Sequence, residues 1–331
     1  MTWPDNTTPW YALDSVIECY VHIASAIQSF EPLLVVTTDP VATRQEMLSL
    51  SEKLGLPLDV DAIRFAACPI NDTWARDHGG ISVWGDEGEK YLYDFVFNGW
   101  GLKFGSDLDN QITRRIFLDG NFAEDVMCVD MRPFVLEGGS IDSDGKGSLL
   151  TTSSCLLSLN RNEYLDKEEI EGELRHAFGL RRVLWLENGS IAGDDTDSHV
   201  DILARFAPDD TIVYTSCDDP LDENYPSLRA LEEELGGLRT LEGKPYRLLR
   251  LPLPPASYLD GYRLPASYAN FLVVNGGVIM PGCGCELDAI AAAVLENAFP
   301  GRKVVVVDCR ALLSGHGGLH CVTMQFPKGW L

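Results

Sequence analysis

Cys321, ten residues before Leu331, is the side chain in this sequence best suited to act as a nucleophile. It follows the step Gly317-Gly318, and glycines let a ligand or another backbone segment come close. A thiolate attacks electrophilic carbon readily when a nearby base or cation supports it. A lone cysteine is more often an inert core residue, so this interpretation needs partner residues elsewhere in the chain.

The β-branched residues after Cys321 predict a short strand that begins near the cysteine. Side chains alternate along a strand, so Cys321, Thr323 and Gln325 would share one face. His320 would then point to the other face and could not serve as the base for Cys321. We therefore expect a histidine from a distant part of the sequence to perform that role.

Residues 71–80 crowd polar, charged and aromatic side chains into a loop that precedes an apolar run. Loops at strand ends commonly carry binding residues. Asp77 could accept hydrogen bonds from a cationic ligand, and Trp74 could stack on that ligand. An equally good alternative is structural, in which Arg76 pairs with Asp72 or Asp77. In that case Trp74 packs as a core residue.

Two further segments offer a carboxylate or a histidine. Glu137 directly follows an apolar run, a position that can line a site, although a surface glutamate is the commoner outcome. The alternating pattern of residues 199–206 predicts a strand with His199 and Asp201 on one face. A histidine beside an aspartate suits a base next to a group that binds a cation.

An acidic run precedes that predicted strand and could in principle bind Ca²⁺ or Mg²⁺. The spacing and the distal glutamate of an EF-hand are absent, so ordinary loop acids are the alternative. The nine cysteines show no paired zinc-ligand spacing either. The sequence therefore contains no recognisable metal-binding motif. The run consists of Asp194, Asp195 and Asp197.

A cysteine, a histidine and several carboxylates without a metal motif fit nucleophilic attack on a carbon bonded to nitrogen. A guanidinium suits these carboxylates best, because it is planar, always charged and forks onto carboxylate oxygens. The carboxylates would raise the pKa of the Cys321 thiol in an empty site, and a bound cation or charged His199 would lower it. We therefore hypothesise that the thiolate forms mainly when substrate is bound.

The composition describes an acidic globular protein. The 331 residues are 45% hydrophobic and carry a net charge of −24, which disfavours nucleic acid or an anionic membrane surface as a partner. Nine cysteines, an odd number in a chain of this size, argue against a secreted disulfide scaffold. Without a signal peptide or an apolar run of transmembrane length, the cytoplasm is the expected compartment. The sequence leaves a homo-oligomer open.

Helices and strands alternate along the chain. Short β-branched runs predict the strands, several of them paired as hairpins around turn residues. Apolar residues three and four positions apart predict helices at residues 13–29, 41–54, 108–118, 167–178, 226–235 and 286–299.

A glycine step that leads into an apolar residue recurs along the chain and predicts a repeated supersecondary unit. Glycine pairs are also common turns, which is the alternative. No linker divides the chain, so we expect residues 1–331 to form a single α/β domain of radially repeated units. The steps lie at residues 79–80, 138–139, 189–190, 276–277 and 317–318.

Together these segments resemble the agmatine deiminase family, which is close to the bacterial-type peptidyl-arginine deiminases within the guanidine-modifying pentein superfamily. The resemblance covers nearly the whole chain, and its specificity lies in the joint order of the motifs. The matching segments are residues 71–79 (NDTWARDHG), 137–162, 194–206 (DDTDSHVDILARF), 264–281 and 299–327.

The resemblance implies a five-bladed α/β propeller of ββαβ-type units and a deiminase that needs neither a metal nor an organic cofactor. Cys321 would attack the guanidinium carbon, while Asp77 and Asp201 would hold the guanidinium nitrogens. His199 would give a proton to departing ammonia and then activate water, with Glu137 orienting it. For agmatine, a covalent thiouronium would be hydrolysed to N-carbamoylputrescine.

The resemblance also assigns substrate contacts. Trp74 would line the substrate channel, and Gly318 would lie against the substrate. Two residues beside the nucleophile depart from the family pattern and bear on substrate choice. His316 stands where a glycine is usual, and Leu319 replaces a residue that is usually polar.

Other functions share this chemistry. Peptidyl- and free-arginine deiminases and amidinotransferases use the same thiouronium, and an inactive guanidine-binding protein could keep the scaffold. A metal-dependent enzyme would instead lose activity to a chelator. Free arginine needs a cation for its α-carboxylate, which favours a substrate without one. The candidates for that cation are three arginines of the motifs, Arg76, Arg161 and Arg205.

Overall fold

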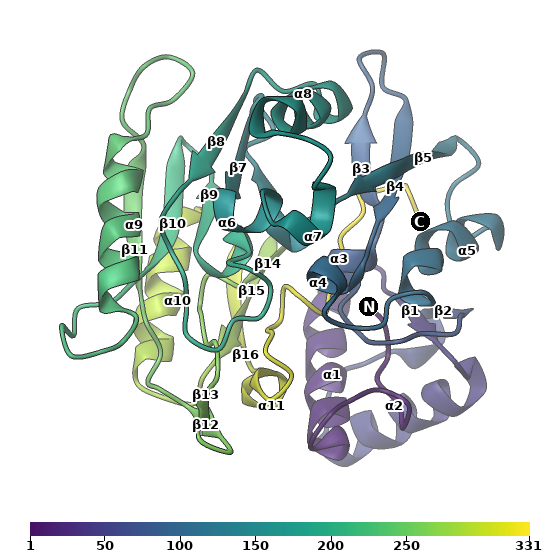
Figure 1. Ribbon diagram of the computed structural model, residues 1–331. Coiled ribbons are helices and arrows are strands. Elements are labelled where there is room, and N and C mark those ends of the chain that lie inside the picture. Colours follow the sequence, from purple (N-terminus) through teal and green to yellow (C-terminus); the bar gives the residue numbers. More distant parts are fainter. The chain divides into compact units, whose positions relative to one another are not determined.

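The computed structural model describes residues 1–331 and contains two compact units. The N-terminal unit comprises Met1–Gly138 together with Leu319–Leu331, and the central unit comprises Gly139–Gly318. Cys321 therefore belongs to the N-terminal unit, although most of that unit comes from the other end of the sequence. Figure 1 shows the elements of both units.

The N-terminal unit combines a two-stranded and a three-stranded sheet. Strands β1 and β2 pair in parallel, whereas β3 and β4 form an antiparallel hairpin and β5 returns parallel to β4. Parallel pairing requires a crossover, which α2 and α5 supply. The elements are α1 (Leu13–Gln28), β1 (Leu34–Thr37), α2 (Pro40–Leu54), β2 (Arg64–Ala67), α3 (Ala75–His78), β3 (Ile81–Trp84), β4 (Lys90–Val96), α4 (Gly99–Leu102), α5 (Ile112–Leu118) and β5 (Val126–Val135).

Three three-stranded sheets form the central unit, in the orders β6-β7-β8, β9-β10-β11 and β14-β15-β16. Each is an antiparallel hairpin followed by a helix and a parallel third strand. The elements are β6 (Ile141–Ser143), β7 (Ser148–Thr152), α6 (Ser153–Leu156), α7 (Leu159–Asn162), α8 (Lys167–Phe178), β8 (Arg182–Leu186), β9 (Ala204–Ala207), β10 (Thr211–Ser216), α9 (Tyr225–Gly237), β11 (Arg247–Pro252), β12 (Tyr258–Leu259), β13 (Tyr262–Arg263), β14 (Leu272–Val274), β15 (Gly277–Gly282), α10 (Leu287–Ala298), β16 (Lys303–Asp308) and α11 (Arg310–Leu313).

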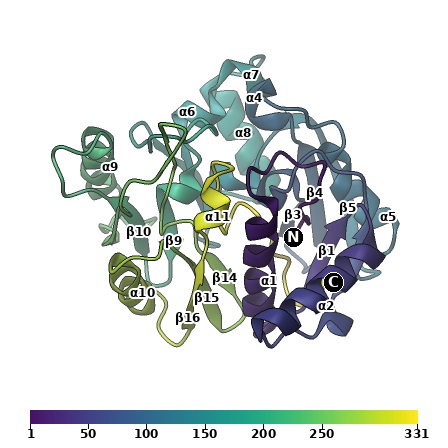
Figure 2. The ribbon, with the colours of Figure 1, turned by 90° about the horizontal axis from the view of Figure 1, so that it is seen from below.

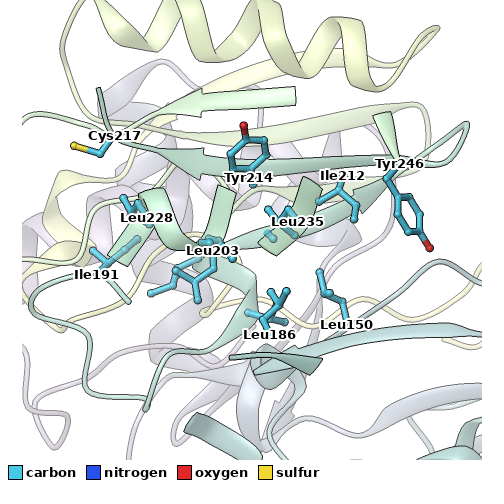
Figure 3. Close-up of a cluster of buried hydrophobic side chains, with 14 residues drawn as sticks. Leu150, Leu186, Ile191, Leu203, Ile212, Tyr214, Cys217, Leu228, Leu235 and Tyr246 are labelled. Carbon is cyan, nitrogen blue, oxygen red and sulfur yellow. The ribbon is translucent and has the colours of Figure 1, made fainter. Parts of the chain in front are cut away.

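A leucine-rich core anchors α9 in the central unit (Figure 3). Leu228, Leu231 and Leu235 recur at helical spacing along α9 and are at most 1% exposed. They cluster with Leu203 and Ile212. Burying such a side chain stabilises the fold by about 1.5–3 kcal/mol, so this stripe determines which face of α9 turns inward. Helix α10 lies along the β14-β15-β16 sheet in the same way (Figure 2).

The mixed α/β class is confirmed, and four sheets follow the same hairpin, helix and strand order. The radial five-bladed arrangement and the single domain over residues 1–331 stay predictions. The glycine step at residues 276–277 does lead into a strand, because Asn275-Gly276 makes the hairpin turn before β15 and Gly276 has φ of 80°. The steps at residues 189–190 and 317–318 lead into turns and loops instead of strands, so the repeated glycine signal is wrong at those two places. No helix combines the length and apolar character needed to span a membrane.

Candidate active site

Cys321 lies in a turn rather than on a strand. Residues 319–322 form the turn, and the Thr323 N–H donates to the His320 carbonyl over 3.1 Å. The Thr323 hydroxyl is 3.0 Å from the carbonyl oxygens of both Leu319 and His320. The predicted strand is wrong because this hydroxyl offers the backbone a competing partner. The argument that strand alternation turns His320 away from Cys321 fails with it.

Arg76 ties the cysteine segment to α3 within the N-terminal unit. Its backbone N–H donates to the Cys321 carbonyl over 3.0 Å. Its guanidinium donates to the His320 carbonyl over 3.4 Å and to the Gln325 side-chain oxygen. Arg76 is only 4% exposed, so these bonds satisfy a buried cation. Arg76 thus holds the Cys321 segment beside α3.

Two of the predicted glycine steps permit close packing around α3. A Cβ atom at Gly79 would lie 2.4 Å from the Ala75 carbonyl oxygen, and one at Gly138 would lie 2.3 Å from that of Arg76. Neither position can accept a side chain without a backbone shift. Glu137, immediately before Gly138, is fully buried. The commoner outcome for a glutamate, exposure at the surface, is therefore wrong for Glu137.

Asp77 and Trp74 sit at the same helix. Asp77 is 4% exposed, and one of its carboxylate oxygens, Oδ2, accepts a hydrogen bond of 3.0 Å from the Trp100 indole N–H. The Trp74 ring packs against Trp10 with their centroids 5.2 Å apart. Sequence reasoning missed Trp100. Its signal was the flanking pair Gly99 and Gly101 directly after the aromatic-rich run at residues 91–97.

His199 and Asp201 come from a 3₁₀ turn in the central unit, because residues 200–202 form that turn and β9 begins only at Ala204. The predicted strand face is therefore wrong, although both side chains are at most 1% exposed. The start of the turn is held by hydroxyls. Thr152 Oγ1 donates to the Ser198 carbonyl over 2.7 Å, and the His199 N–H donates to Thr196 Oγ1 over 3.1 Å.

The end of the turn is held in the same way. The Ile202 carbonyl accepts hydrogen bonds from Thr215 Oγ1 and Ser267 Oγ, over 2.8 Å and 2.7 Å. The side-chain amide of Asn270 then donates to Asp201 Oδ2 over 3.1 Å. Asn270 lies within a segment that carries the family resemblance, but sequence reasoning did not select it. Its donor group is what orients the Asp201 carboxylate.

Gly318 packs directly against Asn270. A Cβ atom at Gly318 would lie 2.5 Å from the Asn270 side-chain oxygen, so this position admits no side chain while Asn270 holds Asp201. His316 adopts a left-handed φ of 64°, and its Nδ1 is 2.7 Å from the Gly193 carbonyl oxygen. A hydrogen bond at that distance requires the proton on Nδ1, which leaves Nε2 as the acceptor of the neutral ring.

The acidic run shapes its own loop. Asp194 accepts from the backbone N–H groups of Thr196 and Ser198, over 3.1 Å and 2.7 Å. Asp197 pairs with Arg161 over 2.6 Å, and the Arg161 side chain is fully buried. These contacts support the alternative of ordinary loop acids for Asp194 and Asp197.

Arg205 is also bound within the central unit. It pairs with Asp142 over 2.6 Å and donates to the Phe271 carbonyl over 3.1 Å. Its guanidinium also lies 4.9 Å from the centre of the Phe271 ring. The three candidate arginines, Arg76, Arg161 and Arg205, therefore all make buried bonds to the protein itself.

Burial shifts the pKa values of three titratable side chains in and around α3 and the loop that precedes it. The Asp109 carboxylate accepts from the backbone N–H groups of Asn71 and Asp72, over 2.7 Å and 3.0 Å. Burial nevertheless raises the pKa of Asp109 to about 7, and burial raises the pKa of Asp72 to about 6. Burial lowers the pKa of His78 to about 3, so its ring is neutral at pH 7.

Each of the two units holds some of the predicted site residues. In the N-terminal unit, α3 and its bonds to the cysteine turn bring together Trp74, Asp77 and Cys321, with the Glu137 segment packed on α3. In the central unit, Asn270 joins Asp201 to Gly318, and the 3₁₀ turn carries His199.

Comparison with known proteins identifies the family. Residues 1–327 match the Porphyromonas-type peptidyl-arginine deiminase family, and the chain belongs to it. An agmatine deiminase from Pseudomonas fluorescens is 34% identical over 99% of this chain and 92% of its own length.

Solved structures of similar proteins match this chain over nearly its whole length. A candidate arginine deiminase from Porphyromonas gingivalis is 48% identical, with a TM-score of 0.91 over 100% of this chain and 95% of that one. A cysteine-to-serine variant of C. jejuni agmatine deiminase, crystallised with substrate bound, is 38% identical. Its TM-score is 0.86 over 97% of this chain and 90% of that one.

Proposed function

We propose that this protein hydrolyses agmatine to N-carbamoylputrescine and ammonia through a covalent intermediate on Cys321. The choice of substrate rests on the burial and bonding of three arginines in the motifs. Arg76, Arg161 and Arg205 are each at most 7% exposed and bonded within the fold. A free α-carboxylate would need such a cation, and agmatine has no carboxylate. The agmatine deiminase from Pseudomonas fluorescens supports the same choice.

The reaction proceeds in two balanced steps. The Cys321 thiolate forms a C–S bond at the guanidinium carbon, one C–N bond breaks, and His199 supplies the proton with which ammonia leaves. Water then adds to the thiouronium carbon while His199 accepts one of its protons. The C–S bond breaks to restore the thiolate, and the remaining proton passes to solvent as the ureido product leaves.

The other predicted residues bind and orient. Asp77 and Asp201 hold the guanidinium nitrogens, because carboxylates match the planar donors of a guanidinium. Glu137 orients the His199 ring, and Trp74 and Gly318 line the path of the substrate. The substrate-bound cysteine-to-serine variant of C. jejuni agmatine deiminase supports an attacking cysteine of this kind.

A peptidyl-arginine deiminase is the second candidate. The family description and the 48% identity to the Porphyromonas gingivalis protein favour it. An arginine inside a peptide also lacks a free α-carboxylate, so the motif arginines argue against free arginine but not against a peptide. The two candidates differ in the size of the group that must enter beside the guanidinium.

The deciding experiment supplies agmatine, free arginine and an arginyl peptide to the purified protein and measures ureido product and ammonia. We expect agmatine to be turned over with the highest kcat/KM and Cys321→Ala to be inactive. Higher kcat/KM for the peptide would make this a peptidyl-arginine deiminase. No turnover of any guanidine, or full turnover by Cys321→Ala, would refute the proposed function.

A further inference from the structure

Four consecutive residues after β4 adopt left-handed backbone angles. The φ values of Gly99, Trp100, Gly101 and Leu102 are 69°, 56°, 80° and 65°. L-residues avoid this region, and each one in a left-handed helical turn costs roughly 1–2 kcal/mol. Trp100 and Leu102 therefore hold strain that the surrounding structure must oppose. Strain of this kind concentrates at functional sites and invites the question of what it achieves.

Local bonds and packing force the turn. The Asn98 side-chain oxygen accepts from the Gly101 N–H over 3.0 Å, and the Gly99 carbonyl accepts from the Lys103 N–H over 3.0 Å. A Cβ atom at Gly99 would lie 2.2 Å from the Phe104 carbonyl oxygen, so only glycine fits there. The backbone conformation is thus specified by neighbours within a few residues.

The turn aims one side chain. Trp100 is 6% exposed and held edge to face between the rings of Phe97 and Phe104, at 4.9 Å and 5.6 Å. In this orientation its indole N–H points at Asp77 Oδ2, 3.0 Å away. Helices α3 and α4, which carry the two residues, lie side by side in Figure 1.

In the hydrogen bond between Trp100 and Asp77, the donor and the acceptor are fixed by chemistry. An indole N–H can only donate, so its partner oxygen on Asp77 must accept. A fixed donor favours the ionised carboxylate and sets its rotation, and the other lone pairs of the carboxylate then face a fixed direction. A buried hydrogen bond between a neutral donor and a charged acceptor is also stronger than one at the surface.

We propose that Trp100 is a positioning residue for guanidinium binding: the strained turn at residues 99–102 holds its indole N–H on Asp77 so that this carboxylate meets the substrate ionised and correctly oriented. The proposal rests on the function proposed above, in which Asp77 binds the guanidinium. It adds a residue that acts on substrate affinity through its hydrogen bond to Asp77.

The test compares Trp100→Phe with Trp3→Phe. Trp3 is a matched control, because it is 1% exposed, lies in the same unit and donates its indole N–H to the Glu46 carboxylate over 2.9 Å. We expect Trp100→Phe to raise KM for agmatine roughly tenfold to hundredfold, the range for hydrogen bonds to charged groups, with a smaller change in kcat. Trp3→Phe should lower the melting temperature without moving KM.

Binding is measured separately from chemistry. In a Cys321→Ala background, Trp100→Phe should weaken the calorimetric Kd for agmatine by the same factor. Phe104→Ala guards against misfolding of Trp100→Phe, because Phe104 is 51% exposed yet packs on the Trp100 ring. Phe104→Ala should raise KM for agmatine severalfold and lower the melting temperature only slightly.

The outcomes separate the two proposals. A parent enzyme that neither turns over nor binds any guanidine refutes the proposed function, and the role of Trp100 falls with it. An active parent in which Trp100→Phe matches Trp3→Phe in KM and Kd refutes the role of Trp100 alone. If Trp100→Phe does not fold, an unchanged KM in Phe104→Ala has the same consequence.

Discussion

Asn270 donates its side-chain amide to the Asp201 carboxylate over 3.1 Å, and the two side chains are 2% and 0% exposed. The Asn270 oxygen meanwhile abuts Gly318, three residues before the proposed nucleophile. One buried amide therefore links a proposed guanidinium carboxylate to the segment that leads to Cys321. Trp100 plays the corresponding part for Asp77.

Replacing Asn270 with aspartate keeps the shape and removes the donor. Two neighbouring carboxylates in a buried site share a proton, so the Asp201 carboxylate loses part of its charge. We expect KM for agmatine to rise at least tenfold, measured by steady-state kinetics at pH 7. Asn224→Asp is the control, because Asn224 is 3% exposed and its oxygen accepts from the Ala192 N–H over 2.7 Å, a bond that aspartate can keep. Equal effects of the two variants would contradict the prediction.

Gly318→Ala should strongly reduce activity. The new Cβ atom would lie 2.5 Å from the Asn270 oxygen, and Asn270 cannot move aside without releasing Asp201. Steady-state kinetics should show kcat/KM reduced by more than tenfold. Gly172→Ala in α8 is the matched control, since nothing lies within 4 Å of its Cβ position. That change should leave activity intact and stabilise the fold by about 0.4–1 kcal/mol. Activity retained in Gly318→Ala would show that the contact is not needed.

His199→Ala should lose far more activity than His320→Ala. The turn that carries His199 is held by hydrogen bonds to hydroxyls at both of its ends, which fixes the backbone of a residue proposed to transfer protons. The hydrogen bonds that His320 accepts from Arg76 and Thr323 end at its backbone carbonyl, which alanine retains. Ammonia release under saturating agmatine is the measurement. Losses of the same size would mean that the His320 ring takes part in the reaction.

Stability should fall as pH rises through the range in which Asp109 ionises. Burial raises the pKa of Asp109 from its ordinary value of 3.8 to about 7. The folded state therefore binds a proton that the unfolded state has lost, so the contribution to stability is complete below pH 4 and declines up to about pH 7. Asp109→Asn keeps an acceptor for the Asn71 and Asp72 N–H groups and should flatten this dependence. Chemical unfolding at pH 5 and pH 8 tests it, and parallel curves for both proteins would contradict it.

Cys321 should react slowly with alkylating agents in the free enzyme. The hypothesis drawn from the sequence is that the carboxylates proposed to bind the guanidinium disfavour the thiolate until a cation is bound. The pH dependence of iodoacetamide inactivation measures the thiol pKa. A value below about 7 without substrate would refute the hypothesis.

The sequence by itself determined the elements whose signals are local. Helix α8 runs over Lys167–Phe178, as predicted, because Asp166 and Glu169 form a capping box at its start and Gly179 takes the left-handed cap at its end. The joint order of the motifs also carried the family, which the comparisons confirm. Helix caps and motifs both lie in short stretches of the chain, so they can be recognised without knowledge of the fold.

Tertiary structure alone decided how the proposed site residues are held. Alternation predicted a strand at His199, but hydroxyls from Thr152, Thr215 and Ser267 bind the carbonyls at both ends of the segment and favour a 3₁₀ turn. The donors to Asp77 and Asp201 come from 23 and 69 residues away. Sequence patterns report local preference and burial, whereas a hydrogen bond between distant residues exists only once the chain has folded.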